Sequence, residues 1–190
     1  MRHIATVAWE LFETMGFEQI SMETIATQAD VAKATLYKYF DSKEALLEFQ
    51  LRHSMGEQRE HIQTELLQRP TLRSRLDFLF QVEAEFLESK KNYMKPLLHH
   101  RLRQFQNHQS SRDKSQFFQA LVIIFQMAQQ TGELRRDLSA ESMANYLNFL
   151  RSADLFDWLS GPQEDLRQLH HRMLDLFMEG ACFQKPEANS

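Results

Sequence analysis

Apolar side chains recur every three or four residues along the first fifteen positions, the spacing that places them on one face of an α-helix. Gly16 follows them, and glycine readily adopts the left-handed conformation with which many helices end. The pattern therefore predicts an amphipathic helix over residues 2–15. Its apolar face consists of Ile4, Val7, Ala8, Leu11, Phe12 and Met15.

The same helical period continues along the chain and predicts an all-α protein of about nine helices, since no segment alternates as a β-strand does. Ser21, Thr71 and Ser139 are suitable N-caps, because a hydroxyl can accept a hydrogen bond from an amide of the first helical turn. Asp41 and Glu44 have the spacing of a capping box. The further helices are predicted over residues 22–29, 33–39, 42–67, 72–89, 96–106, 115–131, 139–159 and 162–180.

Proline and glycine mark several of these boundaries. Pro96 and Pro162 are placed in the first turns of their helices, where the missing N–H of proline is tolerated. Pro70 ends the long helix, and Gly132 and Gly161 end two others.

Composition narrows the possible functions. Fifteen Phe and nine Met indicate an adaptable aromatic interior that could double as a cavity for an apolar ligand, with ordinary core packing as the alternative. The net charge of −4 argues against indiscriminate binding to nucleic acid. A DNA contact must therefore use local charge, and residues 31–43 carry three lysines against Asp41.

The single cysteine, Cys182, excludes an intramolecular disulfide and a zinc site built from several cysteines. This fits a reducing cytoplasm. No apolar run approaches the roughly 18 residues of a membrane-spanning helix, and the N-terminus lacks the apolar core of a signal peptide. We therefore expect a cytoplasmic protein without a membrane segment.

Residues 21–46 have the arrangement of a helix-turn-helix. Ala26 is small enough for a second helix to cross closely over the first, and Asp30 can tolerate the positive φ of the turn. Leu36 supplies a core anchor. The other face of the second helix is then free to enter a major groove. It carries Lys33, Ala34, Thr35, Tyr37 and Lys38.

The first 50 residues resemble the N-terminal domain of TetR-family repressors. The matching positions are Gly16, Phe17, Ser21, Ile25, Ala26, Thr35, Leu36, Tyr37, Phe40, Lys43 and Glu44. The resemblance implies a helix-turn-helix domain over residues 1–46 and a ligand-binding and dimerisation domain over residues 47–190. It further implies a homodimeric transcriptional regulator, by default a repressor, that a small-molecule effector releases from a palindromic operator.

By this resemblance, a set of side chains would contact DNA. Base edges would meet Lys33, Ala34, Thr35 and Tyr37, and phosphates would meet Ser21, Thr24, Tyr39 and Lys43. The sequence departs from the family pattern at Asp30 and Ala32, where Gly and Ser are usual, and at Lys38 and Tyr39, where Tyr and His are common. The operator sequence is therefore beyond inference. The alternative is a helical subdomain that binds a protein partner in place of DNA.

The segment 139–159 is apolar around nearly its whole circumference, so it must be covered on two sides. One side would face its own core, and the other a second subunit, together with the last helix. The alternative is a helix buried inside a monomer. The predicted interface comprises Met143, Leu147, Leu150, Trp158, Leu166, Met173 and Phe177.

The effector site, again by resemblance, would lie between the helices of about residues 42–131. The aromatic bias favours an apolar or flat molecule. Candidate lining residues are Phe78, Phe86, Met94, His99, Phe105, Phe117, Phe118 and Phe125.

Metal binding and catalysis find little support in the sequence. The adjacent pairs His99-His100 and His170-His171 lack the i,i+4 partners of a known metal site, although His171 and Asp175 come closest. There is no glycine-rich phosphate loop, Gly-x-Ser-x-Gly elbow or nucleophilic cysteine at a helix start. We therefore expect no metal, no cofactor and no enzymatic activity.

Overall fold

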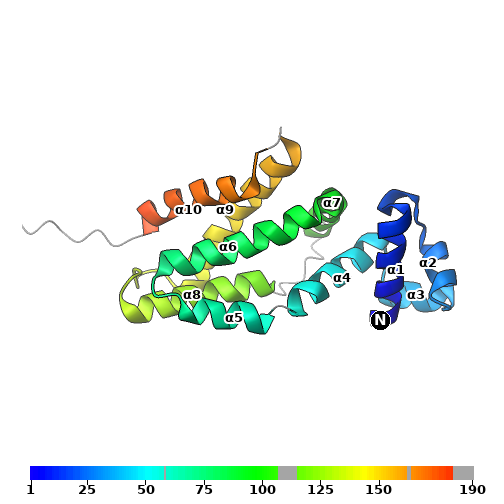
Figure 1. Ribbon diagram of the computed structural model, residues 1–190, viewed down its shortest axis with the longest axis horizontal. Coiled ribbons are helices and arrows are strands. Elements are labelled where there is room, and N and C mark those ends of the chain that lie inside the picture. Colours follow the sequence, from blue (N-terminus) through cyan, green and yellow to red (C-terminus); the bar gives the residue numbers. More distant parts are fainter. Residues whose placement is uncertain (58, 107–114, 162–163, 182–190) are drawn as a thin grey trace, which may run out of the picture. The chain divides into compact units, whose positions relative to one another are not determined.

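Every regular element in the described part of the chain is a helix, as the period of its apolar positions predicted. The computed structural model describes residues 1–57, 59–106, 115–161 and 164–181. Figure 1 shows the elements in chain order. They are α1 (Arg2–Met15), the 3-10 helix η1 (Phe17–Gln19), α2 (Met22–Gln28), α3 (Lys33–Tyr39), α4 (Lys43–Glu57), α5 (Arg59–Gln68), α6 (Leu72–Ser89), α7 (Lys91–Gln106), α8 (Gln116–Thr131), α9 (Ala140–Ser160) and α10 (Leu166–Ala181).

The helices form two compact units. The first comprises Met1–Glu60 and Lys90–Ser110 and holds α1 to α4 together with α7. The second comprises His61–Ser89 and Ser111–Ser190 and holds most of α5 together with α6, α8, α9 and α10. The predicted functional division between residues 46 and 47 stays a prediction, since compactness also groups α4 and α7 with the N-terminal helices.

The first unit is built around the buried face of α1. Phe12 is 2% exposed and packs its ring against Phe17 at a centroid distance of 4.9 Å. Gly16 links the two at a φ of 85°, a conformation that a side chain would strain. Helix α4 packs against α1 and α7, and α2 packs against α1 and α3.

The second unit has a core shared by four helices. Helix α6 contacts α8, α8 contacts α9, α9 contacts α10 and α10 contacts α6, so the contacts form a closed cycle. Each helix therefore buries an apolar stripe against two neighbours. The side chains of this core with less than 2% exposure are Leu72, Leu76, Phe80, Leu121, Ile124, Phe125, Ala128, Ala144, Leu147 and Leu174. None of the described helices is long and apolar enough to cross a membrane.

Three predicted N-caps are confirmed and one is wrong. The Ser21 hydroxyl accepts a hydrogen bond from the Thr24 amide at 3.1 Å, and Thr71 and Ser139 cap their helices in the same way. Asp41 does not cap α4. Ser42 does, because its Oγ accepts from the Ala45 amide at 3.2 Å, so the helix begins one residue later than predicted.

The predicted helix 42–67 is described as α4 and α5 on either side of residue 58, which lies outside the described residues. The start of another helix differs from the prediction. Helix α7 begins at Lys91, so Pro96 lies inside it. The first turn is held from outside the helix, because Tyr93 packs on Trp9 at a ring distance of 4.9 Å. Pro162 lies outside the described residues.

The turn between α2 and α3 has the geometry that the sequence predicted. Asp30 has a φ of 51°, the one positive value at a non-glycine position in the described chain. The Val31 amide then donates to the Ala26 carbonyl at 3.0 Å and closes the turn. Ala26 is 4% exposed, so a larger side chain would separate the helices here.

Asp30→Ala should lower the free energy of unfolding by about 1 kcal/mol, because alanine tolerates the left-handed region less well than aspartate. Asp30→Asn should match the wild type within about 0.5 kcal/mol, since asparagine also adopts this conformation. Urea unfolding followed by circular dichroism measures both. An alanine variant as stable as the wild type would contradict the role of this turn.

Candidate nucleic-acid interface

Helix α3 presents almost its entire surface to the outside of the first unit. Leu36 is its single buried residue, at 0% exposure. Tyr37 and Tyr39 are 43% and 49% exposed, although tyrosine rings are usually covered. A helix fixed by one anchor leaves its other side chains for an external partner. They are Lys33, Ala34, Thr35, Tyr37, Lys38 and Tyr39, all exposed.

The predicted hydroxyl contacts lie at the start of α2. Ser21 is exposed, and its Oγ lies 3.0 Å from the Thr24 Oγ1 while it accepts from the Thr24 amide. Thr24 is half-buried. The cap thus fixes the positions of the two hydroxyls that are predicted to contact phosphate.

The two lysines of α3 differ in their partners. Lys33 forms an ion pair with Glu23 of α2, which lowers the pKa of the Glu23 carboxyl and raises the pKa of the lysine through their hydrogen bond. Lys38 lies with its Nζ 5.9 Å from the centre of the Tyr39 ring. A phosphate would therefore compete with Glu23 for Lys33.

Lys43, predicted to meet a phosphate, is used inside the unit. Its Nζ donates to the Phe17 carbonyl at 2.9 Å, lies 4.5 Å above the Phe17 ring and is 3.8 Å from a carboxylate oxygen of Glu18. The side chain is 21% exposed. These contacts tie the start of α4 to η1, which the sequence analysis missed because the partners lie 26 residues apart.

Lys43→Met should lower the free energy of unfolding by about 1–2 kcal/mol, because the apolar stem stays over Phe17 while the charged hydrogen bond is lost. Lys38→Met should change it by less than about 0.5 kcal/mol, since Lys38 is exposed. Chemical unfolding of both variants gives the comparison. Equal stability of the two would show that the contact of Lys43 with η1 contributes nothing.

The predicted effector-site residues do not come together in one unit. Phe117, Phe118 and Phe125 are buried in the core of the second unit, where Phe78 is half-buried against them and carries the Arg69 guanidinium 3.7 Å above its ring. Phe86 is half-buried on α6. Met94 and His99 lie on α7 in the first unit, the former buried and the latter exposed, and the Phe105 side chain lies outside the described residues.

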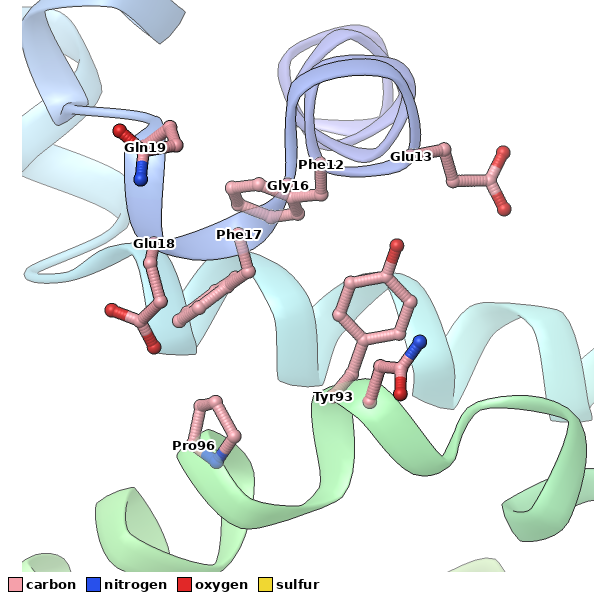
Figure 2. A pocket seen from close by; sticks show the side chains of 9 residues that line it. Phe12, Glu13, Gly16, Phe17, Glu18, Gln19, Tyr93 and Pro96 are labelled. Atoms are coloured by element: carbon pink, nitrogen blue, oxygen red, sulfur yellow. The ribbon is translucent and has the colours of Figure 1, made fainter.

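A pocket of about 380 Å³ lies in the first unit, where the end of α1 and η1 face α7. The rings of Phe17 and Tyr93 point into the space, whereas the Glu13 carboxylate points away from it (Figure 2). The sequence analysis missed this pocket, and a Gly-Phe pair after a helix was its one visible signal. The lining residues are Phe12, Glu13, Gly16, Phe17, Glu18, Gln19, Asn92, Tyr93 and Pro96.

Most of the predicted dimer-interface residues are buried inside their own unit. The buried ones, at 6% exposure or less, are Met143, Leu147, Trp158, Leu166 and Met173. Leu150 and Phe177 are half-buried against the same core. The five buried side chains fill the subunit core, so a partner subunit would contact more exposed residues, and the predicted interface stays a prediction.

Other apolar side chains of α9 and α10 remain uncovered. Tyr146 is 63% exposed and Phe149 is 77% exposed, three residues further along the same helix. Leu176 on α10 is 67% exposed. Helical spacing places Tyr146, Phe149 and Ala153 on one face of α9. Because α9 is apolar around nearly its whole circumference, the sequence does not distinguish this exposed face from the buried one.

The histidines do not assemble into a metal site within the described residues, where no group of three potential ligands lies together. His99 and His171 are exposed, whereas His100 and His170 are 7% and 2% exposed. His171 contacts Asp175 and Arg73, so its nearest carboxylate is already paired with a guanidinium. Cys182 lies outside the described residues.

Residues 4–48 match the family model described as bacterial regulatory proteins, tetR family. A regulator of Mycobacterium tuberculosis, named putative mycofactocin biosynthesis transcriptional regulator MftR, is 46% identical over 44 residues, which is 23% of this chain. The fatty acid metabolism regulator protein of Bacillus subtilis is 24% identical over 147 residues, which is 77% of this chain. These matches span 22% and 62% of the length of the two relatives.

A solved structure resembles the chain over its full length. It is the Thermus thermophilus FadR, described as a TetR-family transcriptional repressor in complex with lauroyl-CoA. The two are 25% identical with a TM-score of 0.81, and the comparison covers 100% of this chain and 98% of the other. Both the exposed helix α3 and the helices of the second unit therefore have counterparts in one known molecule.

Proposed function

We propose that this chain, a member of the TetR family of bacterial regulatory proteins, represses transcription as a homodimer that binds a palindromic operator and leaves it when a long-chain acyl-CoA binds. The observation that carries the proposal is α3, anchored by Leu36 alone and exposed at its six other residues. Such a helix matches the width of a DNA major groove.

The exposed side chains of α3 suit the reading of bases. Thr35 can hydrogen-bond a base edge or place its methyl against that of thymine, and Tyr37 offers a hydroxyl donor. Lys33 and Lys38 supply positive charge for phosphates or for guanine. Ser21, Thr24 and Tyr39 are proposed to position the helix on the backbone. For Lys43 we propose the indirect role of holding α4 against η1, since its ammonium is already bound there.

Two relatives support an acyl-CoA as the effector. The Thermus thermophilus protein was crystallised with lauroyl-CoA, and the Bacillus subtilis relative is named for fatty acid metabolism. The second unit of this chain offers apolar surroundings that suit an acyl chain, because phenylalanine and leucine side chains make up much of its core. We assign the acyl chain to this core, near Phe117, Phe118 and Phe125, and not to the polar-edged pocket at the end of α1.

Two further statements complete the proposal. We infer that the protein catalyses no reaction, because its relatives are regulators and the sequence lacks a glycine-rich phosphate loop and a Gly-x-Ser-x-Gly elbow. We also infer that it acts in the cytoplasm, because operator DNA is accessible there. A single cysteine, which cannot form an intramolecular disulfide, fits this reducing compartment.

Tyr37→Ala should weaken operator binding by about 10- to 100-fold, the loss expected when one or two base contacts per site are removed. The operator is first obtained by selecting duplexes from a random library with the wild-type protein, and affinity is then measured by fluorescence anisotropy. Leu67→Ala, an exposed residue of α5 in the other unit, should bind as the wild type does. Selection of no common sequence by the wild type would contradict the proposed function.

We place the dimer interface at the exposed side chains of α9 and α10, Tyr146, Phe149 and Leu176. Phe149→Glu should therefore convert the homodimer into a monomer of 22.5 kDa, because a charge in an apolar interface would be desolvated without a partner. Sedimentation equilibrium measures the mass directly. Leu67→Glu introduces the same charge at a residue of similar exposure, 63%, and should stay dimeric. The proposed interface is wrong if the Phe149 variant keeps twice the monomer mass.

A further inference from the structure

The core of the second unit contains a buried group of polar side chains that packing does not require. Glu83 on α6 is 3% exposed and His170 on α10 is 2% exposed. Arg151 on α9 reaches them with a side chain that is 13% exposed. Charged and polar groups are rarely buried to this extent unless they bind one another or a ligand.

Glu83 and Arg151 satisfy each other. The Arg151 Nε lies 2.7 Å from both carboxylate oxygens of Glu83, and one terminal nitrogen donates to the Asn148 Oδ1 at 3.0 Å. The guanidinium carbon lies 4.5 Å from the centre of the Phe117 ring. The pair therefore carries no net charge, and Phe117 connects it to the predicted effector-site residues.

His170 differs, because neither of its ring nitrogens makes a well-formed hydrogen bond within the described residues, although the Phe80 backbone lies close enough to act on the ring. The ring packs edge-on against Phe80 at a centroid distance of 4.9 Å. Burial lowers its pKa to about 4; the charge of Arg151 lowers that pKa further, whereas the charge of Glu83 and the contact with the Phe80 backbone raise it. At neutral pH the ring is therefore uncharged, with one donor and one acceptor unused.

We propose that His170, beside the Glu83–Arg151 pair, hydrogen-bonds the uncharged polar group of the effector, the thioester carbonyl of an acyl-CoA. This inference rests on the proposed function and assigns the polar contact within that site. An uncharged group is favoured because the ion pair is already balanced and the imidazole is neutral, so a carboxylate would be buried without a counter-charge. The Phe80 ring contacts both His170 and Phe117, and these apolar surroundings would hold the adjoining acyl chain.

The test compares His170→Phe with His171→Gln, an exposed neighbour on the same helix, by calorimetric titration with lauroyl-CoA. His170→Phe should bind at least tenfold more weakly than the wild type. Its melting temperature should be equal or higher, since an unpartnered buried polar ring is removed. His171→Gln should bind as the wild type does. His170→Gln, which keeps a donor and an acceptor, should recover part of the affinity.

The outcomes separate this inference from the function on which it rests. If His170→Phe binds lauroyl-CoA as tightly as the wild type, the inference is overturned and the proposed effector stands. If the wild type binds the operator but not lauroyl-CoA, the proposed effector is wrong and the inference falls with it.

Should His170→Phe fail to fold, histidine ring signals of the ¹⁵N-labelled wild type decide. The two ring nitrogens of His170 should shift when lauroyl-CoA is added, and those of His171, assigned from the His171→Gln spectrum, should not. Unchanged His170 signals in the saturated complex would overturn the proposal.

Discussion

The anchoring of α3 by a single fully buried side chain is the constraint on which the proposed DNA-binding surface depends. Leu36 gives this seven-residue helix its one contact with the core, and Phe40 follows at 5% exposure where the helix ends. A helix this short is unstable in isolation. Its position is therefore set from outside, by the turn at Asp30 and by the small Ala26, and the remaining side chains are left exposed.

Lys43 extends this dependence from the turn to the long helix behind it. Its ammonium holds the start of α4 to the backbone of η1, and Phe12 packs on the Phe17 ring beneath the same lysine. Helix α4 packs in turn against α7. Movement of α4 is thus coupled to the N-terminal helices through a charged hydrogen bond.

Local chemistry made much of this predictable from the sequence. The caps at Ser21, Thr71 and Ser139, the positive φ of Asp30 and the burial of Leu36 follow from properties of residues close together in the chain. Features that depend on residues far apart in the chain could not be predicted in this way. The period of α9 could not say which of its two apolar faces meets the subunit's own core, because α8 and α10 decide that.

The buried polar residues were unpredictable for the same reason. A histidine on an amphipathic helix looks alike in sequence whether it is solvated or buried, and the partner of Glu83 lies 68 residues away at Arg151. Pro96 similarly seemed to mark a helix start, since the contact of Tyr93 with Trp9 that supports the preceding turn is not local.

The account as a whole requires that operator and effector oppose each other in binding. A preference of about 2.7 kcal/mol for the released state corresponds to a hundredfold change in affinity, and thermodynamic linkage makes that factor the same for both ligands. Calorimetric titration of lauroyl-CoA into the free protein and into its complex with the selected operator measures it most directly. The account predicts about hundredfold weaker binding to the complex, and equal affinity for both forms would contradict it.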